Sequence, residues 1–354
     1  MSWAATVLVG FSLLSASPAA IAIEAISYGE KVIGPQKHAI HVRALGPDLF
    51  GEEVSASTGG ISFSQTDLAL PGNDGLSVAV TRRLEVDGNK TPSSPGDENL
   101  WRGYAFGEWE LDLPYLSATY AQAQGWVVDT SAPNARCSSP TNPDQYRPPS
   151  VSVGEVHFLN YSIWNGISLN VPGGGEQGVL YRSPGGPIPA PAGNWTNLTT
   201  KSHWRFGCLT ELQSGQAGEG FLALAPDGTK YFFNWMVDYL ERPLKGSGTL
   251  VLGSGRVFRQ FAELPRRTYR IYPTRIEDRF GNYVTYTWSG SALSSITASD
   301  GRQISFTYSS GRIASATTGT RSVSYGYSDG LLSSVTLPDN SQFTFSSAAM
   351  LGLA

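Results

Sequence analysis

Short runs of alternating apolar and polar residues, separated by turn residues, recur along most of this chain. The clearest set lies between Asp278 and Phe345, where a turn followed by alternating aromatic and polar residues occurs four times. The copies are 278–288 (DRFGNYVTYTW), 299–308 (SDGRQISFTY), 318–327 (TGTRSVSYGY) and 338–345 (PDNSQFTF). Related links at 292–297, 312–317 and 331–336 add a second apolar run between copies. Since alternation at period two predicts a half-buried strand, each copy predicts one β-hairpin.

The copies share a regular frame. Anchored on Asp278, Asp300, Gly319 and Asp339, they are spaced by 22, 19 and 20 residues. The sixth residue after each anchor is Val284, Phe306, Tyr325 or Phe345, and the eighth, in the first three copies, is Tyr286, Tyr308 or Tyr327. Repetition near 20 residues is typical of β-repeat proteins, in which each hairpin buries its apolar face by stacking on its neighbours.

Each repeated residue type has a structural role in this frame. We expect turn positions at Asp278, Gly281, Asp300 and Gly301, with Asp278 accepting hydrogen bonds from backbone N–H groups of its own turn. We expect the three tyrosines of the frame to pack as a ladder between neighbouring hairpins. The fourth copy departs from the pattern, because Asn340 stands at the turn glycine and Ser347 at the tyrosine position.

Similar signals precede the repeats. Turns at 58–60 and 71–75 flank alternating runs, and Asp227-Gly228 lies in APDGTKYFF (225–233), a diverged copy of the later repeats. Proline- and glycine-rich stretches at 129–154 and 172–193 predict surface loops. No long window shows clean 3.6-residue periodicity, so the predicted class is all-β.

Composition supports a packed protein. With 16 Tyr, 15 Phe and 9 Trp among 354 residues, the chain is too aromatic for disorder, since such rings bury large areas when they pack. The net charge of −4 and the pI of about 5.6 argue against a nucleic-acid partner.

The N-terminal segment resembles an export signal. An apolar run at 4–22 ends in Ala20-Ile21-Ala22, so we expect a signal peptide over residues 1–22 and a secreted or cell-surface location. The basic start of such a signal is missing, which a start codon placed too late explains. The alternative is a buried or membrane-anchoring helix, although the central apolar stretch of about 11 residues is short for a membrane span.

The cysteine content fits export. Cys137 and Cys208 are the two cysteines of the chain, and in an oxidising compartment we expect them to form a disulfide that contributes about 4 kcal/mol. Two free thiols are the alternative. The two cysteines and four scattered histidines have no metal-ligand spacing, so we expect neither metal nor cofactor.

The strongest candidate for catalysis is a row of carboxylates. Glu108, Glu110 and Asp112 alternate with apolar residues, and alternate residues of a strand lie about 6.5–7 Å apart, within the range for paired glycosidase carboxylates. An acidic outer face opposite an apolar inner face is, however, ordinary for a half-buried strand. We therefore expect no enzyme site.

The motif of turn glycine, then aromatic-x-Tyr, then Gly-x-Leu/Ile-x-x-Ile/Val-Thr resembles the YD repeat of the RHS-repeat family. The segment 58–82, which begins Thr-Gly and contains Thr-Asp-Leu-Ala-Leu-Pro-Gly before a strand ending in Arg, resembles the segment that precedes the repeats in that family. The resemblance implies a secreted bacterial protein whose repeats form a β-strip shell around a C-terminal toxin domain.

These observations predict five segments: a signal peptide (1–22), an RHS-type β segment (23–100), a β-rich region with loop insertions (101–265), YD repeats (266–345) and a truncated end (346–354). The expected function is a non-catalytic scaffold, the N-terminal part of a shell. Its expected partner is a toxin domain absent from this chain or a component that completes the shell. The alternative is a carbohydrate-binding or adhesive surface protein that contacts cell-surface glycans through the aromatic residues of 101–235.

Overall fold

A computed structural model describes residues 41–42, 52–55, 61–72, 75–86, 105–126, 134–138, 150–154, 156–164, 166–173, 175–182, 193–251 and 257–345. The all-β prediction is confirmed: the chain is 63% strand, and α2 (Asn160–Ile163) is a single short helical turn. The predicted signal peptide at 1–22, the end at 346–354 and Ser347 lie outside the described residues.

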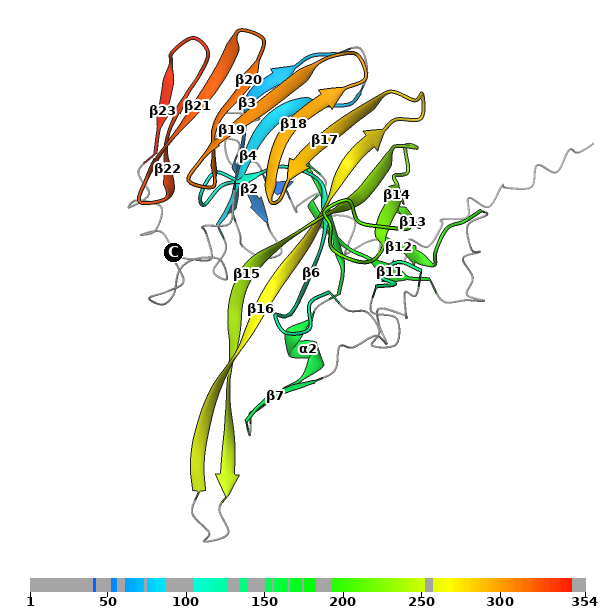
Figure 1. Cartoon of the computed structure of the whole chain (residues 1–354), viewed down its shortest axis with the longest axis vertical. Helices are drawn as coiled ribbons and strands as arrows, with labels where there is room; N and C mark the ends of the chain where they lie inside the picture. The colour runs from blue at the N-terminus through cyan, green and yellow to red at the C-terminus, as the bar shows by residue number, and fades with distance from the viewer. Residues whose placement is uncertain are drawn as a thin grey trace, which may run out of the picture.

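The first sheet is antiparallel and comes from the N-terminal part of the chain (Figure 1). Its strands follow one another in sequence order: β1 (His41–Val42), β2 (Glu52–Ser55), β3 (Ile61–Leu70), β4 (Val78–Val86) and β5 (Glu110–Leu111). We call it the N-terminal sheet.

The second sheet has 16 strands, 13 of which form a continuous antiparallel path in sequence order. They are β11 (Leu180–Tyr181), β12 (Leu198–Thr199), β13 (Arg205–Leu209), β14 (Gly220–Leu224), β15 (Lys230–Val251), β16 (Val257–Glu277), β17 (Tyr283–Ser289), β18 (Ala292–Ala298), β19 (Gln303–Ser309), β20 (Arg312–Thr318), β21 (Arg321–Ser328), β22 (Leu331–Thr336) and β23 (Gln342–Thr344). We call this the repeat sheet.

Three further strands join the repeat sheet beside its path. β6 (Tyr115–Ala121) pairs with β16 and with β9 (Ser168–Val171), which pairs with β10 (Gly175–Gly178). A separate small hairpin consists of β7 (Val151–Val153) and β8 (Val156–Phe158).

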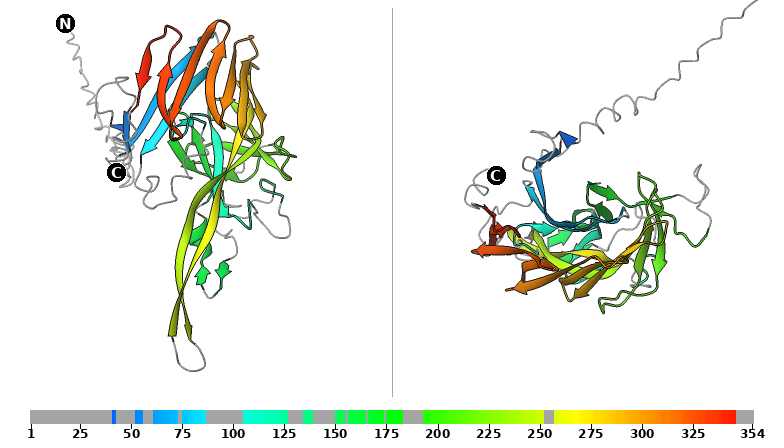
Figure 2. Two further views of the ribbon diagram at one scale, coloured as in Figure 1. Left: turned by 60° about the vertical axis from the view of Figure 1, so that its left-hand side comes forward. Right: turned by 90° about the horizontal axis from the view of Figure 1, so that it is seen from above.

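The repeated segments form hairpins as predicted. β17–β18, β19–β20 and β21–β22 are three successive units, and β23 starts a fourth. Their strands have six to eight residues. Figure 2 shows them side by side in a curved sheet, with β3 and β4 against one of its faces.

The diverged copy at 225–233 opens a much longer hairpin of the same strip. β15 has 22 residues and β16 has 21, and together they extend away from the rest of the molecule as an arm (Figure 1). Both the Asp227 turn and the Asp300 turn place an aspartate just before a glycine with positive φ, 92° at Gly228 and 90° at Gly301. The boundary expected between residues 265 and 266 falls inside β16, where the sheet continues without a break.

The predicted equivalence of Tyr286 with Tyr308 and Tyr327 is wrong, because the equivalent residue of the first copy lies two positions further along the chain. Cross-strand pairing places Tyr308 opposite Ile313 and Tyr327 opposite Leu332, but the residue in that position of the first hairpin is Trp288, opposite Leu293. Tyr286 instead occupies the position of Phe306 and Tyr325, with partners Ile296, Ala316 and Val335 in the three hairpins.

The cause lies in the turn at the start of the first copy. The Asp278 N–H donates to the Asn282 carbonyl at 2.9 Å, and the Ala298 N–H donates to the Arg302 carbonyl at the same distance. Asp278 is therefore equivalent to Ala298, two positions ahead of Asp300. A repeat aligned on aspartate is shifted at this copy, whereas Gly281 and Gly301 are equivalent residues.

The described part of the molecule has two large hydrophobic cores. One lies between the N-terminal sheet and the hairpins of the repeat sheet. The other lies beside the base of the arm, among β6, β9 and β12 to β16, and includes buried Trp126, Trp164, Trp204 and Cys137. Four tryptophans of 101–235, on which the glycan-binding alternative depends, are thus core residues: Trp109, Trp126, Trp164 and Trp204.

Candidate functional site

The region where the N-terminal sheet packs on the repeat sheet brings together polar residues from distant parts of the chain. We call this region the seam. Its apolar part joins buried side chains of β3 and β4 to buried side chains of the repeats, namely Leu68, Val78, Val80 and Leu84 to Ile296, Ile304, Ile313, Val323, Leu332 and Val335. This apolar contact defines the seam, and a few ionic and polar side chains lie within it.

The first polar group of the seam is a buried ion pair. Arg82 donates through Nε to Asp67 Oδ2 at 2.5 Å and through Nη2 to Asp67 Oδ1 at 2.8 Å. The two side chains are 1% and 0% exposed. The Tyr325 hydroxyl donates to Asp67 Oδ2 at 3.0 Å, so a repeat hairpin contacts the same carboxylate. Burial, followed by the Asp67 charge, raises the pKa of Tyr325 and keeps its hydroxyl a donor.

Aromatic rings complete the surroundings of Arg82. Its guanidinium lies 4.9 Å from the ring centroid of Trp109 and 5.3 Å from that of Phe345. Such contacts stabilise a desolvated cation. One arginine therefore connects β4, the segment before β5 and the last described repeat residue.

Two carboxylates of 108–112, Glu108 and Glu110, are buried in the seam. Glu110 accepts from Arg83 Nη2 at 2.7 Å and from Arg270 Nη1 at 2.6 Å. Glu108 accepts the backbone N–H of Leu332 at 2.8 Å, and burial raises its pKa. The expectation of an acidic face in solvent is therefore wrong for Glu108 and Glu110, because the repeat sheet covers that side of the segment.

Asp112 has a different environment. Its backbone N–H donates to the Thr81 carbonyl at 2.9 Å. Burial raises the pKa of Asp112 to about 6, with the Arg83 charge opposing the shift and the Glu110 charge adding to it. Arg83, the ion-pair partner of Glu110, thus also acts on Asp112, while the two glutamates are engaged in structural contacts.

Arginines of the repeats also bind the β3–β4 turn region. Arg302 donates through Nη1 to the Leu70 carbonyl at 3.0 Å, and Arg321 donates through Nη2 to the Ala69 carbonyl at 3.3 Å. These contacts satisfy backbone oxygens at the end of β3. Together with Tyr325, they give each of the second and third hairpins a polar contact with the N-terminal sheet.

The predicted turn residues act locally, outside the seam. Asp278 accepts backbone N–H groups of Phe280 at 2.8 Å and of Asn282 at 2.9 Å, which confirms its predicted role. Asp300 accepts the Arg302 N–H at 3.1 Å in the same way. The pKa of Asp278 is lowered by the Asn282 side-chain amide, which donates to its Oδ2 at 2.7 Å, and by these backbone N–H groups, and the pKa of Asp300 is lowered by the Arg302 N–H.

In the turns that start the copies, the position with positive φ is occupied by glycine or asparagine. Gly281 and Gly301 have φ of 89° and 90°, a conformation that glycine adopts without strain. Asn340 takes the equivalent position in the fourth copy with φ 66°, and asparagine tolerates this region better than most residues.

The three tyrosines of the frame are packed between strands. Tyr286 is buried, while the Tyr308 hydroxyl donates to the Leu293 carbonyl at 2.9 Å and the Tyr327 hydroxyl to the Ile313 carbonyl at 2.7 Å. Each of these two bonds reaches the strand of the preceding hairpin. Tyr308 and Tyr327 therefore form the predicted ladder, and Trp288, which donates to the Pro273 carbonyl at 3.3 Å, extends it.

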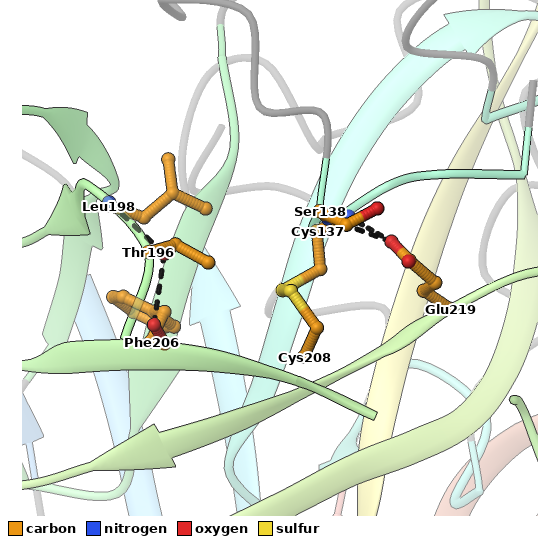
Figure 3. Close-up of a disulfide and its surroundings, with 7 residues drawn as sticks. All are labelled: Cys137, Ser138, Thr196, Leu198, Phe206, Cys208 and Glu219. Carbon is orange, nitrogen blue, oxygen red and sulfur yellow. Dashed lines mark hydrogen bonds between the residues drawn. A yellow bond between two sulfur atoms is a disulfide. The ribbon is translucent and has the colours of Figure 1, made fainter. Parts of the chain in front are cut away.

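The expected disulfide is present. Cys137 and Cys208 are bonded, with their Cα atoms 5.4 Å apart and a sequence separation of 71 (Figure 3). Glu219 accepts the backbone N–H groups of Cys137 at 2.9 Å and Ser138 at 2.8 Å. The bridge and this carboxylate together attach residues 134–138 to β13 and to the loop before β14.

Sequence reasoning did not identify Asp67, Arg82 or Arg270 as site residues, and it gave Tyr325 only a place in the repeat frame. The signal for them is weak, because the partners come from segments up to 258 residues apart. No group of three His, Cys, Asp or Glu residues suited to a metal ion occurs in the described part of the chain. No helix in that part is long and apolar enough to cross a membrane.

Two comparisons with known proteins find no relative of this chain. Neither a scan against protein-family models nor a search of the curated proteins finds a match for this chain. Membership of the RHS-repeat family therefore stays a prediction that rests on the repeat motif and on the segment at 58–82.

Proposed function

We propose that this chain is a non-catalytic structural scaffold, the N-terminal part of a secreted RHS-type shell. In this role the N-terminal sheet closes one end, and the repeat hairpins begin the wall around a C-terminal toxin domain. The observation that carries the proposal is the seam, where the N-terminal sheet is attached to successive repeat hairpins by apolar packing and by buried polar contacts.

The repeat sheet is suited to extension. Each hairpin pairs with the next, and β23 is hydrogen-bonded to β22 in the same register pattern. Among the described strands, β22 is the single neighbour of β23. A further hairpin is the natural partner for the second edge, because an open edge offers unpaired N–H and C=O groups.

The state of the carboxylates supports a structural role. Glu110 is held by two guanidinium groups and Glu108 by a backbone N–H. A catalytic pair needs one carboxyl group poised to donate a proton and another available to the substrate. Both glutamates instead connect layers of the seam.

The test is the genomic sequence downstream of codon 354, followed by protection of its product. We expect more YD copies, in frame or after a frameshift, and a toxin-like C-terminal domain. When the complete product is purified, that domain should resist protease until the shell is unfolded. Unrelated downstream sequence, or a C-terminal domain cleaved as fast as it is when isolated, would refute the proposal.

A further inference from the structure

A cavity of about 170 Å³ lies at the seam, between the β5 segment, the base of the arm and the first two repeat hairpins. Four aromatic side chains line it: Tyr239, Tyr272, Trp288 and Tyr308. Glu110 also contributes to the lining, and exposed Ser291 and Gly311, from two hairpin loops, are at the edge. For comparison, a protein cavity of about 150 Å³ holds one benzene molecule. The space therefore fits a single six-membered ring, and substituents on that ring would extend through the open edge at Ser291 and Gly311.

The aromatic wall is held in place by hydrogen bonds and ring contacts. The Trp288 indole N–H donates a hydrogen bond to the Pro273 carbonyl, and the Trp288 ring centroid lies 4.9 Å from that of Tyr272. The hydroxyl oxygens of Tyr239 and Tyr272 are 3.0 Å apart. A wall whose side chains are already ordered loses little conformational entropy when a ligand binds.

The charges at the cavity favour a neutral ligand. Glu110 is the single charged residue of the lining, and its oxygens are paired with Arg83 and Arg270. Arg270 also lies 4.1 Å from the ring centroid of Tyr115 and 5.2 Å from that of Tyr239. A cationic ligand would compete with Arg270 for the same rings and carboxylate, and an anionic ligand would find no cationic side chain on the lining.

The chemistry of the wall is mixed. Ring carbons form most of it, while the Tyr239 and Tyr272 hydroxyls, the Glu110 carboxylate and Ser291 supply polar atoms. A hexopyranose matches this mixture, because its C–H faces pack on aromatic rings and its hydroxyls bond to polar groups at the edge. We propose that this cavity binds one neutral hexose ring of a glycan, a function independent of the scaffold role.

The experiment is saturation-transfer NMR on the whole chain with glucose, galactose and N-acetylglucosamine as separate probes. We expect saturable binding of at least one sugar with a dissociation constant on the order of 1 mM, typical for a small ligand. Ser291→Trp should weaken it at least about tenfold, since an indole at the exposed edge fills the opening (a change of about 1.4 kcal/mol). Thr320→Trp, in an exposed turn at the opposite end of the hairpins, is the matched control and should bind like the parent.

Three results would overturn the inference. The first is that no probe binds the parent chain at concentrations about twenty times the expected dissociation constant. The second is that Ser291→Trp binds sugar as well as Thr320→Trp does. The third is that N-acetyltyrosine amide or tetramethylammonium binds at this edge while the sugars do not, which would assign the cavity to a partner's aromatic side chain or to a cation. Near-UV circular dichroism of both variants checks that they are folded.

Discussion

Gly107 lies where the segment before β5 meets the third repeat hairpin. Its φ is 77°, and a Cβ atom at this position would be 2.6 Å from the backbone oxygen of Gly330. The clashing atom belongs to the backbone and not to the end of a flexible side chain, so the clash is relieved only if the backbone moves. At the residue scale the seam therefore depends on a glycine as well as on its ionic groups.

We expect Gly107→Ala to lower the free energy of unfolding by about 2–4 kcal/mol, through a backbone clash added to an unfavourable φ. Gly173→Ala is the matched control, with φ 71° and no atom within 4 Å of its Cβ, and should cost about 1 kcal/mol. Urea denaturation followed by tryptophan fluorescence measures both. Equal losses in the two variants would contradict the close approach at Gly107.

Asp112 gives the seam a pH dependence. The folded pKa of about 6 lies above the ordinary aspartate value of 3.8, so between these pH values the folded state holds more protons than the unfolded state. The contribution of Asp112 to stability therefore falls as pH rises through this window and is most unfavourable above about pH 6.

The variant that tests this is Asp112→Asn, which resembles the protonated form. It should be more stable than the parent by about 1–2 kcal/mol at pH 7, and the difference should shrink towards zero near pH 4. Urea midpoints measured at both pH values decide the matter. A constant difference would show that folding does not shift the pKa of Asp112, and a less stable variant at pH 7 would show that the charged carboxylate is favoured in the fold.

What the sequence predicts at this scale depends on the distance between partners along the chain. The hydrogen bonds of Asp278 lie within its own turn, and its role followed from local turn chemistry. Alternation within one strand predicts a solvated face for Glu110. The pattern distinguishes the two faces of the strand, but it does not show that another sheet covers the polar face. Arg270, the ion-pair partner of Glu110, is 160 residues away.

At the scale of elements, the disulfide closes a loop across the proline-rich insertions. Without it, residues 134–138 would be held by contacts such as those of Glu219 and by the Arg136–Ala217 hydrogen bond. A loop of this length gives a calculated stabilisation of about 4 kcal/mol by restricting the unfolded chain.

We expect neither cysteine to react with an alkylating agent in the folded or the urea-unfolded protein until a reductant is added. The double variant Cys137→Ser/Cys208→Ser should have a free energy of unfolding lower than that of the parent by up to about 4 kcal/mol. Mass spectrometry after alkylation, and urea denaturation, provide the two measurements. Labelling of both cysteines without reductant would rule out the bridge.

The arm is the element whose length the sequence did not predict. The sequence predicts the turn at Asp227, but no rule of repeat length shows that its hairpin continues for more than 20 residues per strand. The small β7–β8 hairpin packs on the middle of the arm, where Val156 and Phe158 contact Leu264 in a buried cluster. Further out, Val257 and Phe261 are 63% and 75% exposed.

We expect the outer arm to be dispensable for folding. Replacing residues 249–259 by Asn-Gly joins Gly248 to Gln260, which are cross-strand partners, through a two-residue hairpin loop. The free energy of unfolding should change by less than about 0.5 kcal/mol, as for other surface changes. A loss of several kcal/mol in urea denaturation would mean that the arm tip makes contacts that its exposure does not indicate.

At the scale of the molecule, the repeat sheet joins its two cores into one structure. β15 and β16 pass through both regions, and Tyr231 packs against both clusters. The N-terminal sheet is attached to this structure through the seam. The all-β class and the hairpin repeat followed from the period-two pattern, whereas the seam joins side chains that no local pattern relates.

A perturbation inside the seam should therefore destabilise the whole chain. Asp67→Ala leaves the guanidinium of Arg82 buried without its carboxylate and should lower the free energy of unfolding by about 3–5 kcal/mol in one cooperative transition. The double variant Asp67→Leu/Arg82→Met should recover much of this loss, because well-packed apolar residues replace a buried ion pair at little cost. Glu263→Ala is the control, since its ion pair with Lys245 is exposed, and should cost no more than about 1 kcal/mol.

Urea denaturation followed by both tryptophan fluorescence and far-UV circular dichroism distinguishes the outcomes. Coincident curves that shift together in Asp67→Ala support a single unit that includes the N-terminal sheet. An early transition that affects one signal, with the main transition unchanged, would show that the N-terminal sheet dissociates by itself. In that case the seam would be a weak contact, and closure of a shell by this sheet would lose its physical basis.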